Sequence, residues 1–184
     1  MVTRCNQGVQ GSLVAHHALA AVPCFLFLLA ARGAQTAGAD SLTAIARDLE
    51  ANCYRDALAK ARHRVRENSG DALAWTYVGM ASVRLGERDA ALEAFENAIA
   101  LSPRDPRPFF DAVLLYDSRN DLDKAVDRYQ RGLAIDGKDE TAQFNYGRLL
   151  LLQGRPAEAE KAFLRTLEIN PRDAGARVEL SRLA

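Results

Sequence analysis

The sequence predicts an all-α protein, an α-solenoid of antiparallel helix pairs stacked in a row, and three observations predict it. The chain matches itself when shifted by 34 residues, most clearly over residues 72–105. Its apolar positions step by three and four, which is the period of a helix buried on one face. Several stretches are rich in Ala, Leu, Glu and Arg, which favour helices over strands. A repeat of this length is typical of units that bury their apolar faces only against neighbouring units.

Four residue columns spaced by 34 define each unit. An aspartate before an apolar-periodic segment predicts an N-cap, because its carboxylate accepts hydrogen bonds from free N–H groups of the first helical turn. A Gly or Asn predicts the end of each first helix, where the left-handed conformation is needed. An alanine column lets two helices cross closely, and a mostly aromatic column follows one turn later. In that order the columns are Asp71, Asp105, Asp139 and Asp173; Asn52, Gly86, Asn120 and Gly154; Ala57, Ala91, Ala125 and Ala159; Ala61, Phe95, Tyr129 and Phe163.

These columns predict the helices and the division of the chain. Helices are expected over residues 41–51 and 55–66, 72–85 and 89–101, 106–118 and 122–135, 140–152 and 156–169, and 174–183. The corresponding units are a degenerate first repeat over 40–71, three full repeats over 72–105, 106–139 and 140–173, and a capping helix over 174–184. A capping helix with a polar outer side is the usual way to close an open stack.

Two of the units match a known repeat pattern through Trp75, Gly79, Ala91, Phe95, Ala98 and Pro103, and through Tyr146, Gly147, Ala159, Phe163 and Pro171. With these residues the chain resembles the tetratricopeptide repeat family, whose helix-turn-helix units form a right-handed superhelix. The unit between them departs from the pattern, because Val113 replaces the small Gly and Gly132 replaces the Ala. Altered packing is therefore expected there. The resemblance is specific over residues 72–173, weaker upstream, and absent from the first forty residues.

The N-terminal segment, residues 1–39, has the layout of a secretory signal peptide. Arg4 precedes an uncharged apolar run over residues 18–31, and small residues lead to an expected cleavage site after Ala39. The run is shorter than the roughly 20 apolar residues of a membrane span, and Pro23 interrupts it. A secreted or periplasmic protein is therefore expected. The alternative is a protein anchored in the membrane by a retained N-terminal segment.

Charge and cysteine content limit the partners and the redox chemistry. The whole chain has 24 basic and 24 acidic residues, and this balance argues against nucleic acid as a partner. Cleavage after Ala39 removes two of the three cysteines and leaves Cys53 alone, so no intrachain disulfide is expected in the mature chain. Cys53 is then expected to be a small, partly buried residue at a turn.

The sequence shows no pattern of a catalytic, cofactor or metal site. It lacks the spacing of His and Cys typical of metal ligands, a glycine-rich phosphate loop and a serine elbow. His63 lies in a basic run over residues 60–66, which predicts a charged, water-facing helix, with contact to an anionic surface as the alternative. A protein without catalytic activity, cofactor or metal is therefore expected.

The resemblance implies a concave groove, lined by the first helices, that binds an extended peptide or a helix of another protein. The expected partner-binding residues, an apolar floor with arginines around it, are Leu73, Thr76, Met80, Arg84, Arg107, Phe110, Leu114, Asp117, Phe144, Arg148 and Leu151. The alternative is that Phe110, Phe144 and Leu151 are buried between neighbouring repeats. The Lys and Asn clamp by which some family members bind C-terminal carboxylates is not expected, because Thr76, Met80 and Asp111 are among the residues at those positions.

These expectations together describe a non-catalytic interaction scaffold that supports assembly of a secreted or envelope complex. One alternative is a membrane-tethered assembly or stability subunit of a larger complex. Another is the specificity arm of an enzyme whose catalytic domain is on a different chain. The sequence makes no prediction about the oligomeric state.

Overall fold

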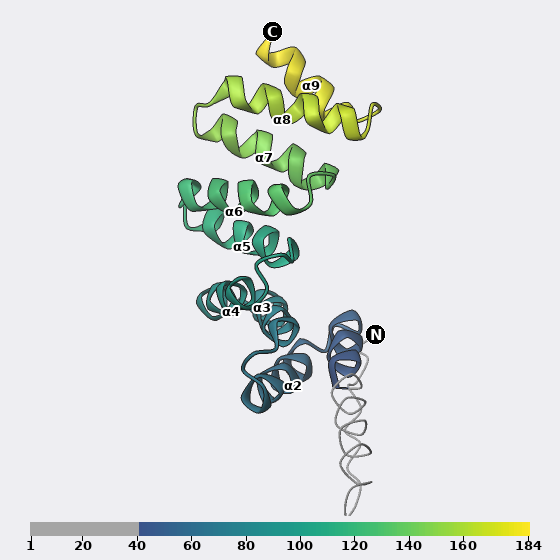
Figure 1. Ribbon diagram of the computed structural model, residues 1–184, viewed down its shortest axis with the longest axis vertical. Helices are drawn as coiled ribbons and strands as arrows, with labels where there is room; N and C mark the ends of the chain where they lie inside the picture. The colour runs from purple at the N-terminus through teal and green to yellow at the C-terminus, as the bar shows by residue number, and fades with distance from the viewer. Residues whose placement is uncertain (1–40) are drawn as a thin grey trace, which may run out of the picture.

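The computed structural model describes residues 41–184, and in that range the chain is a ladder of helices without strands (Figure 1). A helix over residues 41–50 precedes α2 (Tyr54–Glu67). The pairs α3 (Ala72–Leu85) with α4 (Arg88–Leu101), α5 (Arg107–Ser118) with α6 (Leu122–Ile135), and α7 (Glu140–Leu152) with α8 (Pro156–Ile169) follow, and α9 (Ala174–Leu183) ends the stack. Each helix packs on its neighbours in the chain. The predicted all-α solenoid is confirmed.

The predicted signal segment over residues 1–39 lies outside the described residues, so it stays a prediction. Within residues 41–184, no helix has both the length and the apolar character needed to cross a membrane.

The predicted helix ends follow the cap columns. Asp71, Asp139 and Asp173 each accept a hydrogen bond from the backbone N–H three residues later, at 3.1, 2.8 and 2.6 Å. The Gly and Asn column adopts positive φ at all four positions, with values of 60, 80, 57 and 70° for Asn52, Gly86, Asn120 and Gly154. Local chemistry at both ends of the first helices therefore sets where they start and stop.

Asp105 is the exception among the predicted N-caps, and the prediction for it is wrong in detail. The backbone N–H that an aspartate cap normally binds belongs here to Pro108, which has no N–H group. Asp105 instead accepts from the backbone N–H of Arg107 at 3.1 Å and from its guanidinium at 3.0 and 2.7 Å. Helix α5 accordingly begins at Arg107, one residue later than expected.

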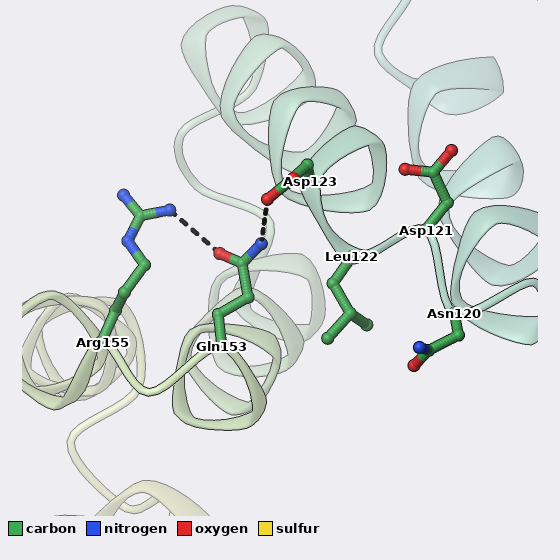
Figure 2. A pocket seen from close by; sticks show the side chains of 6 residues that line it. All are labelled: Asn120, Asp121, Leu122, Asp123, Gln153 and Arg155. Carbon is green, nitrogen blue, oxygen red and sulfur yellow. Dashed lines mark hydrogen bonds between the residues drawn. The ribbon is translucent and has the colours of Figure 1, made fainter.

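Polar contacts tie successive repeats together along the edge formed by the turns. The side-chain amide of Gln153, after α7, donates to Asp123 on α6 at 2.9 Å, and Arg155 donates to the Gln153 carbonyl at 3.0 Å (Figure 2). Arg155 also pairs with Glu158 at 2.7 Å. These groups line a shallow pocket between the turns, and they are already engaged with one another.

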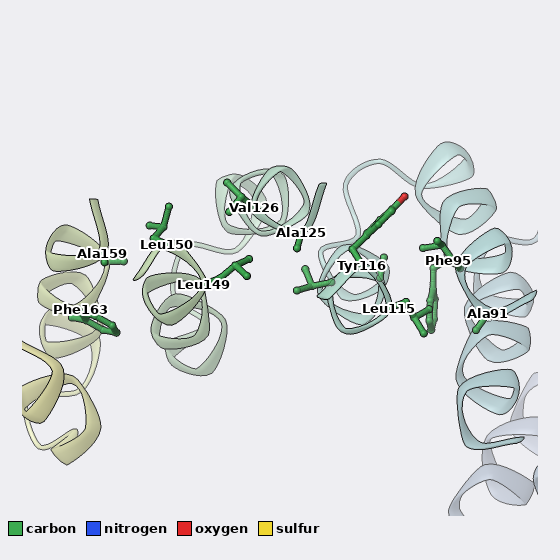
Figure 3. Packing of buried hydrophobic residues seen from close by; sticks show 14 of the residues in the cluster. Ala91, Phe95, Leu115, Tyr116, Ala125, Val126, Leu149, Leu150, Ala159 and Phe163 are labelled. Carbon is green, nitrogen blue, oxygen red and sulfur yellow. The ribbon is translucent and has the colours of Figure 1, made fainter. Parts of the chain in front are cut away.

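The core is an apolar layer between the helices, divided into two clusters, rather than a central globule. One cluster runs from Ala91 on α4 to Ala176 on α9 and includes Phe95 and Phe163, which are 1% and 0% exposed (Figure 3). A second cluster, from Ile45 to Ala94, joins the helix over residues 41–50 and α2 to α3 and α4. No helix pair hides its apolar face alone, as expected for a solenoid.

Glycines in the first helices make room for the aromatic column. A Cβ atom on Gly79 would lie 2.5 Å from the Phe95 ring, and one on Gly147 would lie 2.7 Å from the Phe163 ring. In the α5–α6 pair the large and small residues are exchanged. Val113 takes the place of the glycine, and a Cβ atom on Gly132 of α6 would lie 2.4 Å from the Phe110 ring of α5. The altered packing expected for this unit is thus a size exchange across the two helices.

Cys53 is partly buried at the turn before α2, as expected. It is disulfide-bonded in the full chain. The expectation of a lone thiol concerns the mature chain after cleavage, and it stays a prediction.

Candidate functional site

The candidate site is a pocket of about 400 Å³ between α5, α6 and α7, called here the α5–α7 pocket. Its lining combines apolar walls with a few polar groups. The residues that line it are Phe110, Val113, Leu114, Asp117, Tyr129, Asn145, Arg148, Leu149 and Leu152. Four of the predicted partner-binding residues, Phe110, Leu114, Asp117 and Arg148, therefore come together in one pocket.

Leu114 and Leu152 form an apolar rim of the pocket that is exposed to solvent. Their side chains are among the most exposed large apolar ones in the described chain, at 61% and 69%. They lie on neighbouring first helices, α5 and α7, whose inward positions the repeat brings side by side. Exposed leucines grouped around a hollow are typical of a surface that contacts another molecule.

The size exchange in the α5–α6 pair explains why the pocket forms here. Val113 stands where the neighbouring units have a glycine against the ring of Phe95 or Phe163, and Tyr129 does not bury its ring as these two do. The Tyr129 ring is instead half-buried and lies 6.1 Å from Phe110 and 6.0 Å from the ring of Tyr146. Tyr129 thereby lines the pocket.

The polar groups of the pocket are a phenol, the amide of Asn145 and two opposite charges. Burial, reinforced by the charges of Asp117 and Asp139, raises the pKa of Tyr129 to about 12, while Arg148 acts in the opposite sense. The Tyr129 hydroxyl therefore keeps its proton at neutral pH and remains a hydrogen-bond donor. Asp117 and Arg148 are exposed on α5 and α7.

The structure does not bring the other predicted partner-binding residues into this pocket. Thr76 is only 4% exposed, and its hydroxyl donates to the Ala72 carbonyl of its own helix at 3.0 Å. Phe144 packs on Phe163 with ring centroids 5.6 Å apart. Leu73 and Leu151 are partly buried, Met80 is 39% exposed on α3, Arg84 lies over the Tyr54 ring, and Arg107 pairs with Asp105.

Phe110, Phe144 and Leu151 thus divide between the two interpretations of the sequence. Phe144 and Leu151 pack against the apolar cluster between the repeats, as the alternative expected. Phe110 does both, because its ring packs on Gly132 and also lines the α5–α7 pocket.

Sequence reasoning missed Val113, Tyr129, Asn145, Leu149 and Leu152 as pocket residues. A signal for two of them was present. The departures at Val113 and Gly132 indicated altered packing around Tyr129, and two shifts of 34 residues relate Leu152 to Arg84, which was predicted. Val113 and Tyr129 line the same pocket, and this proximity is visible only in three dimensions.

The basic run on α2 is largely neutralised by ion pairs within the protein. Lys60 pairs with Asp48 at 2.6 Å, Arg62 with Glu87 at 2.9 Å, and Arg64 with Asp71 at 2.9 Å. His63 lies 3.5 Å from Glu67 on the exposed side of the same helix. This favours the charged, water-facing helix over a surface for anionic ligands. The described residues also include no group of three or more His, Cys, Asp or Glu arranged to hold a metal ion.

Asp111 is an unusual carboxyl group near the pocket, on the same helix as Phe110 and Leu114. Its side chain is mostly buried, and burial raises its pKa from 3.8 to about 6, with Arg107 lowering it and Asp105 raising it further. Because the folded-state pKa is above the unfolded one, the folded protein binds this proton more tightly. Stability from Asp111 is therefore present below pH 4 and lost as the pH rises through 6.

Replacing Asp111 with Asn is expected to raise the free energy of unfolding at pH 7.5 by about 2 kcal/mol, with little change at pH 4. The amide keeps the shape and removes the ionisation that burial penalises. Urea denaturation of both proteins from pH 4 to pH 7.5 measures the difference, with the exposed Glu160→Gln as the matched control. Parallel pH profiles of the wild type and Asp111→Asn would contradict the assignment.

Two family models match the chain, and both describe the tetratricopeptide repeat. One covers residues 72–105 and the other covers residues 110–174. Together they span more than half of the chain, and the second includes the whole lining of the α5–α7 pocket.

The curated relatives share the repeats and are much longer proteins. Protein bimA of Emericella nidulans is 30% identical over 101 residues, which are 55% of this chain and 12% of that protein. Protein O-mannosyl-transferase TMTC2 of Homo sapiens is 33% identical over 89 residues, 47% of this chain and 11% of that protein. Cytochrome c-type biogenesis protein CycH of Rhizobium meliloti is 28% identical over 120 residues, 64% of this chain and 32% of that protein. The chain thus spans a third or less of the length of each.

Solved structures show the same fold at low sequence identity. YrrB, described as a TPR protein with an unusual peptide-binding site, superposes with a TM-score of 0.70 at 21% identity, over 78% of this chain and 74% of that one. A tetratricopeptide repeat protein from Parabacteroides merdae superposes with a TM-score of 0.72 at 18% identity, over 80% and 59% of the two chains. At these identities the likeness establishes the architecture alone.

Proposed function

Because this chain belongs to the tetratricopeptide repeat family, a fold that presents surfaces to other proteins, we propose that it binds a segment of a partner protein in the α5–α7 pocket and has no catalytic activity of its own. The observation that supports this best is the pocket itself, with Leu114 and Leu152 exposed at its rim. A protein partner would remove this apolar surface from water, at about 25 cal/mol for each Å² buried.

The proposed setting is assembly of a secreted or envelope complex. It rests on the signal-like layout of residues 1–39 and on the repeat architecture. The name of the relative CycH, a biogenesis protein, agrees with an assembly role, although the chain covers only 32% of that protein. N-terminal sequencing of the protein purified from its own cells tests the setting. A start at Asp40 supports export and cleavage, and an intact Met1 supports retention of the segment.

The binding surface is tested by exposed leucines, because their replacement leaves the core intact. Leu114→Asp and Leu152→Asp are each expected to reduce capture of the partner at least tenfold, since a charge then meets the apolar surface of the partner. Leu164→Asp is the matched control, because Leu164 is 48% exposed on α8 and outside the pocket. Affinity capture with each full-length variant measures the effect, with the amount of one identified bound protein compared between the variants. Circular dichroism confirms that all three variants remain helical, and equal capture by all three would refute the pocket.

A further inference from the structure

We propose that the α5–α7 pocket accepts one large apolar side chain from a partner segment that has a basic residue on the α5 side and an acidic residue on the α7 side. This inference rests on the proposed function and specifies the chemistry of the partner.

The apolar part of the inference comes from the walls of the pocket. Val113 and Leu149 are 4% and 5% exposed and form its floor, while Leu114 and Leu152 form its rim. A volume of about 400 Å³ accommodates a leucine or phenylalanine side chain together with part of the backbone that bears it. Small side chains would leave the rim leucines in contact with water.

The charge pattern comes from two side chains that have no partner in the described part of the chain. Asp117 and Arg148 line the pocket, yet neither makes a side-chain hydrogen bond or ion pair within residues 41–184. The other arginines predicted on the first helices are engaged, Arg107 by Asp105 at 2.7 Å and Arg84 over the Tyr54 ring. Asp117 and Arg148 are therefore the charges that remain available to a ligand at this place.

The position of Asp117 is unfavourable for the helix that holds it. It lies in the last turn of α5 (Arg107–Ser118), where the free carbonyl groups give the helix end a partial negative charge. An unpaired carboxylate there destabilises the helix slightly, and a cation from the partner would relieve this repulsion. A basic residue is thus the complement on the α5 side.

Among the full repeats, the combination of Asp117 and Arg148 occurs only at the α5–α7 pocket, where the size exchange also lies. The residues equivalent to Asp117 by the 34-residue shift are Val83 and Leu151, and those equivalent to Arg148 are Met80 and Leu114. Asp117 raises the pKa of Tyr129 and Arg148 lowers it, so both side chains lie near the Tyr129 hydroxyl. They do not pair with each other. A ligand above Tyr129 therefore meets a negative wall on α5 and a positive wall on α7.

The test uses a display library of random 12-residue peptides, selected against the full chain and separately against the double variant D117R/R148E. Peptides enriched on the wild type should have one Leu, Phe or Trp between a basic and an acidic residue in a fixed order. Peptides enriched on D117R/R148E should show the opposite order. Each enriched peptide is expected to bind its own target about tenfold more tightly than the other one, a difference that falls as salt is added.

Failure of this inference is distinguishable from failure of the proposed function. Peptides that bind wild type and D117R/R148E equally, but lose binding to Leu114→Asp, would overturn the charge pattern and leave the pocket as the binding site. Peptides that bind Leu114→Asp as tightly as wild type, or a selection without any enriched peptide, would count against the pocket itself. Circular dichroism of D117R/R148E verifies its fold, and both substituted residues are exposed.

Discussion

Phe163→Ala is expected to lower the free energy of unfolding by about 3–5 kcal/mol, the largest effect of any single substitution considered for this protein. The Phe163 ring is 0% exposed, covers Gly147 of α7 and packs against Phe144 with centroids 5.6 Å apart. Removing it leaves a cavity that rigid helices on both sides do not close. Because each repeat is stabilised only by its neighbours, the loss spreads to α7, α8 and α9.

Urea denaturation followed by circular dichroism measures this loss. Leu164→Ala is the matched control, since Leu164 is the next residue on α8 and is 48% exposed. Its substitution is expected to change the free energy of unfolding by less than about 1 kcal/mol. Similar losses for the two variants would show that the aromatic column does not hold the stack together.

Gly132→Ala is expected to destabilise the protein by about 1–3 kcal/mol, although it replaces a helical glycine with the best helix former. The equivalent positions of the neighbouring repeats hold Ala98 and Thr166, so comparison of repeats alone predicts stabilisation. The structure predicts the opposite, because the new Cβ atom would lie 2.4 Å from Cε1 of Phe110. The ring would have to leave its place between α5 and α6.

A double-mutant cycle isolates this clash. In a Phe110→Ala background the ring is absent, so Gly132→Ala is expected to stabilise by up to about 1 kcal/mol through helix propensity. The change of sign between the two backgrounds is the decisive observation, and chemical denaturation of the four proteins provides it. The same sign in both backgrounds would mean that Phe110 and Gly132 do not form a size pair.

Much of the fold could be predicted from the sequence, because local chemistry that recurs every 34 residues determines it. The bounds of α3, α6, α7, α8 and α9 were predicted to the residue. Caps such as Asp139 and turn residues such as Gly154 act within a few residues of their own position, so a linear pattern contains the whole cause. Asp105 shows the limit of column reasoning, because its neighbour Pro108 removes the N–H group that the column assumes.

The site was predicted only in part, because it depends on contacts between side chains far apart in the sequence. Leu114 and Arg148 line the α5–α7 pocket because inward positions of first helices recur with the repeat, and their role in partner binding stays a prediction. Thr76 was expected in the groove but is buried, because its short side chain binds the backbone of its own helix. Tyr129 shares a column with Phe95 and Phe163. Its position differs from theirs because Val113 replaces the glycine of the neighbouring units.

The size exchange has a consequence for how such a chain diversifies. One 34-residue unit contains all the residues of the size exchange, Phe110, Val113, Tyr129 and Gly132. The Phe110 ring and the glycine that leaves room for it, Gly132, therefore lie in the same helix pair. Duplication or transfer of that unit would move the size exchange intact, whereas the pocket would form again only beside a following first helix that supplies residues such as Arg148 and Leu152 of α7. A recognition surface in this architecture then depends on which two units are adjacent, so that a new order of existing units can create a new specificity.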